Sequence, residues 1–370
     1  MTYLDHNATT PMRAEAKRAV AAAIDLPGNA TSQHTHGRAA AKLVGDARQS
    51  LGSAFGVCAS DLYFTASGTE ADNQAVLSAV AGGTKRLLVS SMDHPATIEA
   101  GLHSGAEVEF IPAIPDGVTD LAWLEQRLAS WNSADGRPFV SMVAANSECG
   151  VLQPIERAYE LVQAANGLLL VDAVQVAGKV DLPILADYIA WSAHKVGGPK
   201  GVGALYASPD APLEPLIRGG GQEQRKRSGT LNVAGIAGFG AAVEAATTLE
   251  HTREWRDELE ARLQAEEPDL IIVGQGAERL PNTSLLGLPG VSSQTLMMSL
   301  DLEGVSVSTG TACSSGKVGI SRALQAMGLA DTLSKGVIRV SFGHISTRDD
   351  LEHFLSAWKT IRRRSKGIAA

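Results

Sequence analysis

From Leu62 to Ala207 the chain alternates short apolar runs with stretches of helical character, and this alternation restricts the fold more than any other feature. Strands that are separated by helices pair in parallel, because each crossover returns the chain to the same edge of the sheet. The pattern therefore predicts an α/β protein with a mostly parallel sheet between helices. The expected strands are Leu87–Ser91, Val108–Ala113, Phe139–Ala144, Leu168–Val171, Tyr188–Ser192 and Gly203–Ala207.

The helix expected between the strands Phe139–Ala144 and Leu168–Val171 can be predicted in detail. Pro154 suits the first turn of a helix, where its missing N–H has no partner to lose. Asn166-Gly167 marks the end of that helix, because glycine tolerates the left-handed backbone that closes many helices. The run Leu168–Val171 that follows is apolar throughout, which predicts a strand buried on both faces.

After Gly229 the character of the sequence changes towards a smaller α+β domain. We expect residues 13–245 to form a large domain, and residues 1–12 and 246–370 to form the small one. The elements expected after Gly229 are one long Ala-rich helix running from about Val233 into the charged segment Glu250–Glu267, strands near Leu270–Val273 and Gly336–Phe342, and a closing helix from Arg348 to Arg364.

Composition excludes several classes of protein. Of 370 residues 44% are hydrophobic, so the chain is not intrinsically disordered. The net charge of −8 argues against a nucleic-acid binder, which needs a basic face to displace counterions. No apolar run approaches the roughly 18 residues that span a bilayer, and the N-terminus has no signal-peptide pattern. We therefore expect a soluble, cytoplasmic protein without membrane or nucleic-acid partners.

The chain has only three cysteines, Cys58, Cys149 and Cys313. None belongs to a C-x-x-C pair, so we expect no bound metal. An odd number also fits no closed disulfide framework, which indicates a reducing compartment. Cys58 and Cys149 are interpreted as packing residues, although Cys149 lies close to the predicted site.

Polar side chains follow the predicted strands, at the edge where α/β proteins bind ligands. A lysine there can form a Schiff base, and an aspartate can hold a pyridinium nitrogen protonated. The segment Phe64–Glu70 ends a strand and enters a helix with small and hydroxyl side chains, which suits a phosphate. This combination predicts pyridoxal 5'-phosphate as the cofactor. The strand-end groups are Asp93, His94, Asn146, Asp172, Gln175, Ser192, His194 and Lys195.

These residues belong to motifs that occur in order along nearly the whole chain. With them the sequence resembles the pyridoxal-phosphate enzymes of fold type I, and specifically the cysteine desulfurases of the NifS/IscS type. The matching segments are Tyr3–Pro11, Phe64–Asn73, Ala145–Gly150, Val171–Gln175, Ser192–Gly201, Gly219–Glu223, Arg227–Thr230, Ser308–Ser315 and Ile338–Gly343.

The resemblance implies a role for each cofactor-binding residue. Lys195 forms the Schiff base, and His94 stacks on the ring and moves protons. Asp172 pairs with the pyridine nitrogen, and Gln175 with the phenolic oxygen. Thr230 reaches the phosphate of the neighbouring subunit, which implies a homodimer. The residues implied to hold the phosphate within one subunit are Gly68, Thr69, Ser192 and His194.

The resemblance also implies the reaction. L-cysteine becomes L-alanine, and the Cys313 thiolate attacks the substrate sulfur, so that Cys313 carries a persulfide for an acceptor protein such as a cluster-assembly scaffold. Asn146 and Arg339 hold the substrate carboxylate, which suits arginine because its planar fork matches a carboxylate. Gly310 and the small residues around Cys313 predict a mobile sulfur-carrying loop.

Two other enzyme readings stay open, and a scaffold is disfavoured. A selenocysteine lyase would use nearly the same site, and an aminotransferase of this fold would share Lys195 and Asp172 without a use for Cys313. A scaffold without activity would have no reason to hold the complete set of catalytic and binding residues.

The chain departs from the family pattern at His6, at His344 and in Lys317–Ser321, which lacks the usual proline. The last departure bears on the choice of partner. The basic run Arg362–Lys366 suggests, as a further hypothesis, a docking site for an acidic sulfur acceptor.

Overall fold

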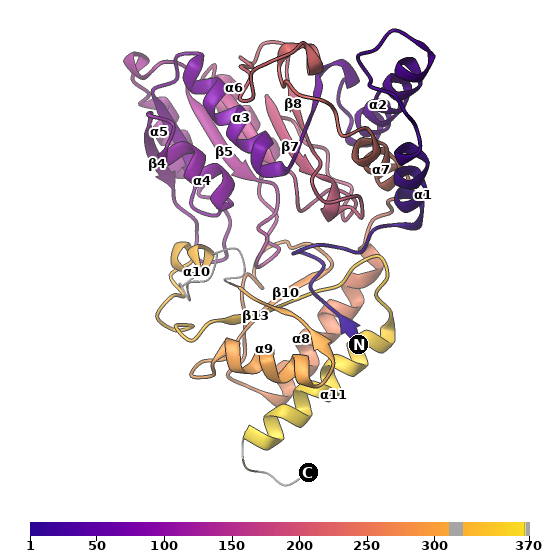
Figure 1. Ribbon diagram of the computed structural model, residues 1–370. Coiled ribbons are helices and arrows are strands. Elements are labelled where there is room, and N and C mark those ends of the chain that lie inside the picture. Colours follow the sequence, from indigo (N-terminus) through magenta and orange to yellow (C-terminus); the bar gives the residue numbers. More distant parts are fainter. Residues whose placement is uncertain (311–320, 366, 368–370) are drawn as a thin grey trace.

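The computed structural model describes residues 1–310, 321–365 and 367, and shows two lobes, one above the other (Figure 1). Cys313 and the segment around it lie outside the described residues. The upper lobe contains a seven-stranded sheet in the order β2-β8-β7-β6-β5-β3-β4. Its strands are β2 (Leu62–Thr65), β3 (Arg86–Ser90), β4 (Glu107–Ile111), β5 (Phe139–Val143), β6 (Leu168–Asp172), β7 (Tyr188–Ser192) and β8 (Gly203–Ala207).

The sheet is mostly parallel, as predicted. Five neighbouring strands of the sheet, β4, β3, β5, β6 and β7, run parallel to one another. The strand β8 is antiparallel to both of its neighbours, β7 and β2. The carboxyl ends of β3, β5, β6 and β7 therefore meet at one edge, which faces the lower lobe (Figure 1). The α/β fold class is confirmed, and the expected strands agree with the observed ones to within about two residues.

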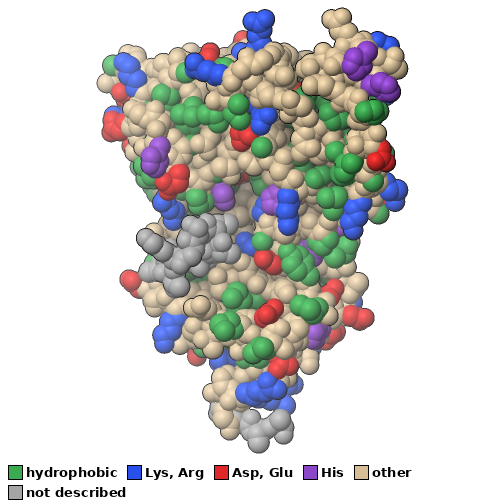
Figure 2. Space-filling model, in the orientation of Figure 1, with side chains coloured by type: hydrophobic (Ala, Val, Ile, Leu, Met, Phe, Trp, Pro, Cys, Tyr) green, Lys and Arg blue, Asp and Glu red, His purple; other side chains and the backbone are tan. Residues whose placement is uncertain are grey.

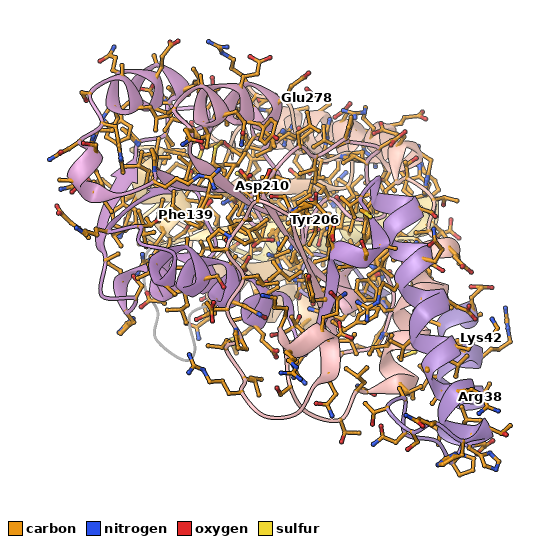
Figure 3. The ribbon with its side chains drawn as sticks, turned by 90° about the horizontal axis from the view of Figure 1, so that it is seen from above. Arg38, Lys42, Phe139, Tyr206, Asp210 and Glu278 are labelled. Atoms are coloured by element: carbon orange, nitrogen blue, oxygen red, sulfur yellow. The ribbon has the colours of Figure 1, made fainter. Side chains whose placement is uncertain are left out.

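Helices cover both faces of this sheet. Leu168 and Leu170 of β6 pack on one face with α3 and α4, and Leu169 and Val171 pack on the other with α2, α5, α6 and α7. Seen from above, Arg38 on α2 lies at the margin, and Phe139 of β5 lies further in (Figure 3). The helices of this lobe are α1 (Ala14–Ile24), α2 (Thr35–Phe55), α3 (Gly68–Ala81), α4 (Pro95–Leu102), α5 (Leu121–Ala129), α6 (Ile155–Ala164) and α7 (Val233–Glu244).

The ends of α6 differ from the prediction. Pro154 precedes the helix as its cap residue, and the first helical residue is Ile155. At the other end the left-handed residue is Asn166, with φ 52°, and not Gly167. Gly167 is needed for space, because a Cβ there would lie 2.8 Å from a methyl of Val162. An asparagine tolerates the left-handed backbone, and the glycine allows the turn to pass close to its own helix.

The lower lobe contains a four-stranded antiparallel sheet in the order β12-β13-β10-β9, and a two-stranded parallel pair in which β1, from the N-terminus, lies beside β11. These strands and the lower helices enclose a separate apolar core. The elements are β1 (Thr2–Tyr3), β9 (Ile271–Ile272), β10 (Thr283–Gly287), β11 (Val305–Ser306), β12 (Ser308–Thr309), β13 (Val337–Ser341), α8 (Arg253–Glu266), α9 (Ser293–Leu302), α10 (Arg322–Ala326) and α11 (Arg348–Ser365).

The prediction of one long helix from Val233 into the charged segment is wrong. The apolar helix α7 ends at Glu244, and the charged helix α8 begins at Arg253 after a short 3-10 turn, Glu250–Thr252. The two helices bury their apolar residues in different cores, so the chain must change direction between them. We keep the proposed domain boundary near residue 245, which falls in this break. The other 3-10 turns are Ala59–Asp61, Ser133–Asp135, Ala193–Lys195 and Gln222–Arg225.

Of the helices in the described part of the chain, none combines the length and apolarity that crossing a bilayer requires. Within the same residues, no three or more His, Cys, Asp or Glu side chains gather as a metal site would need.

Candidate active site

A cavity of about 490 Å³ lies between the lobes, at the carboxyl edge of the large sheet. Figure 2 shows the surface hollowed between the two lobes, with histidine and basic side chains beside the hollow. Side chains from β6, β7, α3 and α4 line it from above, and Arg339 of β13 lines it from below. The sequence-predicted residues that meet in this cavity are Gly68, Thr69, His94, Asn146, Asp172, Gln175, Ser192, His194, Lys195 and Arg339.

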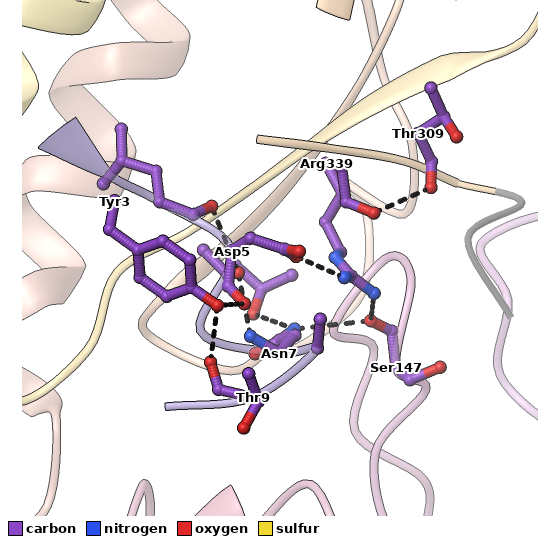
Figure 4. Close-up of polar contacts among 12 residues, drawn as sticks. Tyr3, Asp5, Asn7, Thr9, Ser147, Thr309 and Arg339 are labelled. Carbon is purple, nitrogen blue, oxygen red and sulfur yellow. Dashed lines mark hydrogen bonds and ion pairs between the residues drawn. The ribbon is translucent and has the colours of Figure 1, made fainter. Parts of the chain in front are cut away.

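Lys195 enters the cavity from the 3-10 turn Ala193–Lys195, directly after β7. Its Nζ donates hydrogen bonds to the backbone carbonyls of Asn7 and, at 2.9 Å, of Ala8. Asn7 was not assigned a role from the sequence, although it stands in the first matching motif. Its side chain donates to Thr283 Oγ1 (2.9 Å) and to the Ser147 carbonyl (3.3 Å), so the N-terminal segment connects both lobes beneath the lysine (Figure 4).

Asp172 is the last residue of β6, and only 7% of it is exposed. Burial raises the pKa of its carboxyl, while the nearby charges of His94 and Lys195 lower it. Its Oδ1 accepts a hydrogen bond from the Val174 backbone at 2.9 Å, which fixes the carboxylate at the strand end. A buried carboxylate with few donors favours a cationic N–H as its partner.

The N-terminus of α3 forms one wall of the cavity. Ser67 caps this helix by accepting a hydrogen bond from the Glu70 N–H at 3.1 Å. A Cβ on Gly68 would lie 2.8 Å from Val174 Cγ2, so glycine lets the helix start close to the end of β6. The first N–H groups of a helix attract anions, and Ser192 and His194 stand beside them in the cavity wall. Burial, followed by the charges of Lys195, Lys200 and Lys179, lowers the pKa of His194 to about 4.

His94 precedes α4 and caps it, because its Nδ1 accepts a hydrogen bond from the Ala96 N–H at 3.1 Å. The neutral imidazole therefore carries its proton on Nε2.

Hydrogen bonds to the backbone fix the side-chain amide of Asn146. Its Oδ1 accepts from the backbone N–H groups of Glu148 (2.9 Å) and Cys149 (3.1 Å), and its Nδ2 donates to the Met92 carbonyl at 3.0 Å.

Arg339 is 2% exposed and contacts both lobes (Figure 4). One terminal nitrogen donates to Asp5 Oδ1 at 2.6 Å, and the other donates to the Ser147 carbonyl at 2.9 Å. Its Nε is buried and has no hydrogen-bond partner among the residues that the structure describes. A buried N–H without an acceptor is costly, so this guanidinium is prepared for a further acceptor in the cavity.

Three acids without an assigned role also line the cavity, namely Asp72 and Asp93, which are buried, and Glu148, which is partly buried. Burial raises the pKa of Asp93 to about 7 although Ser141 and the Val143 N–H donate to it. Burial likewise raises the pKa of Glu148 to about 7, and Ser321 donates to its Oε2 at 2.5 Å. The pKa of Asp72 is raised well above its usual value by burial and by the charges of Asp172 and Asp93. Their burial depends on the folded cavity; the sequence marked Asp93 only as a strand-end group, and Asp72 and Glu148 only as members of matching motifs.

Thr230 and Cys149 lie apart from the cavity walls. Thr230 is exposed and does not line the cavity of its own chain. Cys313 lies outside the described residues, between Gly310 and Ser321, which both line the cavity. Cys149 is fully buried, and burial raises the pKa of its thiol to about 12.

The donor set fits pyridoxal 5'-phosphate. The cavity combines an amine on Lys195 for the aldehyde, a buried carboxylate on Asp172 for the ring nitrogen and the capped start of α3 for the phosphate. Gly68 leaves no room for a side chain at the wall where the phosphate would lie.

Comparison with known proteins identifies the family. The model of the class-V aminotransferases matches residues 2–354. The chain belongs to this family. A cysteine desulfurase of Cereibacter sphaeroides is 37% identical over 97% of this chain and 95% of its own length, and a cysteine desulfurase IscS of Dictyoglomus turgidum is 33% identical over 99% and 96%. The structure of a NifS-like protein from Rickettsia africae has a TM-score of 0.87 at 31% identity, over 98% and 99% of the two chains.

These class-V relatives confirm the resemblance to the NifS/IscS type and the fold of type I. Members of the class-V aminotransferase family use pyridoxal 5'-phosphate, and this is the cofactor that the donor set of the cavity fits.

Proposed function

We propose that this class-V family member is a cysteine desulfurase, which converts L-cysteine to L-alanine and leaves the sulfur as a persulfide on Cys313. The observation that carries the proposal is the cavity itself. It brings Lys195, Asp172 and Arg339 together beside Gly310 and Ser321, the described residues on either side of the cysteine segment. Relatives named cysteine desulfurase match nearly the full chain, which supports the same activity.

In this proposal the residues of the cavity would hold the cofactor at its aldehyde, its ring and its phosphate. Lys195 would bind the aldehyde carbon, and Asp172 would accept a hydrogen bond from the ring nitrogen. Gln175 would face the phenolic oxygen, and His94 would lie against the ring. The bound cofactor withdraws electrons from the substrate carbons. The residues that we assign to the phosphate are Gly68, Thr69, Ser192 and His194, together with Thr230 of a second subunit in a homodimer.

Arg339 and Asn146 orient the substrate. The unpartnered Nε of Arg339 offers a donor to the substrate carboxylate, and Asp5 and Ser147 hold the guanidinium in place. Asn146 already uses one Nδ2 proton on the Met92 carbonyl, so its second N–H is the group that would face the substrate.

The side chains of the cavity also handle protons and sulfur. The Nε2 proton of His94 is placed for transfer, because Nδ1 is engaged by the Ala96 N–H. The Cys313 thiolate forms the new S–S bond, the C–S bond of the substrate breaks, and its electron pair stays with the carbon, which takes up a proton and leaves as alanine. A thiolate is the reactive form of cysteine.

We further propose that the persulfide passes to an acceptor protein, such as an iron–sulfur cluster scaffold, in the cytoplasm. The basic run at the end of α11 is a weak candidate for docking that protein. Arg362 forms an ion pair with Glu267 (2.8 Å), and Arg364 with Glu303 (2.6 Å), so two of its charges already have partners in this chain.

The purified protein tests the proposed function directly. With bound cofactor, L-cysteine and a thiol reductant, it is expected to release alanine and sulfide in equal amounts, and Lys195→Ala is expected to release neither. A far higher kcat/KM for selenocysteine would indicate a selenocysteine lyase instead. Alanine formed only when pyruvate is consumed as the amino acceptor, with no sulfide released, would indicate an aminotransferase.

A further inference from the structure

Lys179 lies behind Gln175, just outside the cavity, and only 2% of it is exposed. Its Nζ donates to Gln175 Oε1 at 2.5 Å and to Asn7 Oδ1 at 2.7 Å. The turn before it is tight. Gly178 has φ 67°, and a Cβ there would lie 2.5 Å from Val196 Cγ2, so the backbone at Gly178 passes close to the residue that follows Lys195.

This amine is buried without a carboxylate. Both oxygens that accept its hydrogen bonds are amide oxygens, and within the described residues no Asp or Glu forms an ion pair with it. Burial and the charges of Lys195 and Arg339 lower the pKa of Lys179 well below its usual value. Buried lysines are normally paired with carboxylates, because an unpaired one costs folding free energy. Its position therefore indicates a role in the site and not in the apolar core.

The contact decides how the amide of Gln175 is oriented. The protonated lysine amine has three donors and no acceptor, so it fixes Oε1 of Gln175 towards Lys179, where the structure has this hydrogen bond. The Nε2 group then faces the other way. One of its protons bonds the Asn7 carbonyl at 3.0 Å, and the second remains for the cavity that Gln175 lines.

We propose that Lys179 is a positioning residue, which fixes the side-chain amide of Gln175 so that it donates a hydrogen bond to the phenolic oxygen of the cofactor. This inference rests on the proposed function, in which Gln175 faces that oxygen. A donor at this oxygen stabilises its negative charge and weakens its hold on the proton that it shares with the Lys195 nitrogen. If Lys179 is removed, the amide can turn, and an oxygen in place of the N–H would hold that proton more tightly.

The charged and titratable groups around Lys179 are known from the structure. Lys195 and Arg339 act on Lys179, and Lys179 in turn acts on His194 and His6. The aspartate of the site, Asp172, responds to Lys195 and His94. All of these groups are kept in the variants below, so a change in titration reports on Lys179 and Gln175.

The test is a pH titration of the visible absorption of the purified holoenzyme, without cysteine. The variants are Lys179→Met, Gln175→Ala, the double variant and, as control, Lys200→Met, which removes an exposed lysine near the same site. We expect Lys179→Met and Gln175→Ala each to raise the midpoint of the absorption change by about one pH unit, as for one lost hydrogen bond to a charged group. The double variant is expected to shift no further, and Lys200→Met is expected to match the wild type.

A midpoint of Lys179→Met equal to that of the wild type would overturn the inference, and so would additive shifts in the double variant. If Lys179→Met does not fold, Lys179→Gln keeps an N–H donor and is expected to retain the wild-type midpoint; a midpoint like that of Gln175→Ala would then overturn the inference. Failure of the proposed function is seen separately, as a wild type that forms no alanine from cysteine.

Discussion

At the scale of single residues, burial distinguishes Cys149, which is buried, from Cys58, which is exposed. The pKa of the Cys149 thiol rises from its ordinary value of 9.0 to about 12, so this thiol stays protonated in the folded protein where the unfolded chain has lost the proton. The unfolded state then binds fewer protons than the folded state above pH 9, and stability falls as the pH rises. A protonated thiol is also a poor nucleophile, which agrees with a packing role for Cys149.

We therefore predict that Cys149→Ala weakens the alkaline loss of stability. Between pH 9 and 11 its unfolding free energy is expected to fall less steeply than that of the wild type, by up to about 1.4 kcal/mol per pH unit. Urea unfolding at several pH values measures the slope, which is independent of any cavity that the substitution leaves. Cys58→Ala, at an exposed thiol, is the control. Parallel curves for the wild type and Cys149→Ala would contradict the argument.

At the scale of elements, the start of α3 combines stability with cofactor binding. Ser67 caps α3 beside the cavity, and Ser292 caps α9 in the lower lobe through the Thr295 N–H at 3.3 Å. Ser67→Ala and Ser292→Ala are each expected to cost about 1 kcal/mol of unfolding free energy. Only Ser67→Ala is expected to weaken cofactor binding, by about threefold to tenfold, because only its helix faces the phosphate. Equal cofactor affinity in both variants would contradict the placement of the phosphate at the start of α3.

Elements also show how far the sequence was informative. The strands from β3 to β8 were predicted because each is a continuous apolar run between helical segments. The short strand β10 and the helix α9 were not predicted. Thr283–Gly287 lies in the sheet between β13 and β9, and this pairing is not visible in the local sequence. In the site, motifs marked Lys195 and Asp172. The roles of Asn7 and Lys179 depend on hydrogen bonds that no local pattern reveals, because Lys179 and Asn7 are 172 positions apart and Asn7 and Thr283 are 276 positions apart.

At the scale of the whole molecule, the proposed homodimer predicts a shared site. Thr230 is exposed and absent from its own cavity, so its proposed contact with the phosphate requires a second subunit. In heterodimers purified from co-expressed Lys195→Ala and Thr230→Ala chains, one site carries both defects and the other carries none. We expect such heterodimers to regain about half of the wild-type activity, whereas each homodimer of variants stays low. Inactive heterodimers, or a protein that is monomeric in solution, would contradict the shared site.

The central claim is that sulfur leaves cysteine on Cys313. Mass spectrometry of the protein after one turnover with L-cysteine, without reductant, measures this directly. The account predicts one extra sulfur atom on the peptide that contains Cys313, one alanine released per site, and neither product in Cys313→Ala, which keeps the visible absorption of the bound cofactor. Sulfur found on Cys58 or Cys149 instead, or alanine still formed by Cys313→Ala, would contradict it.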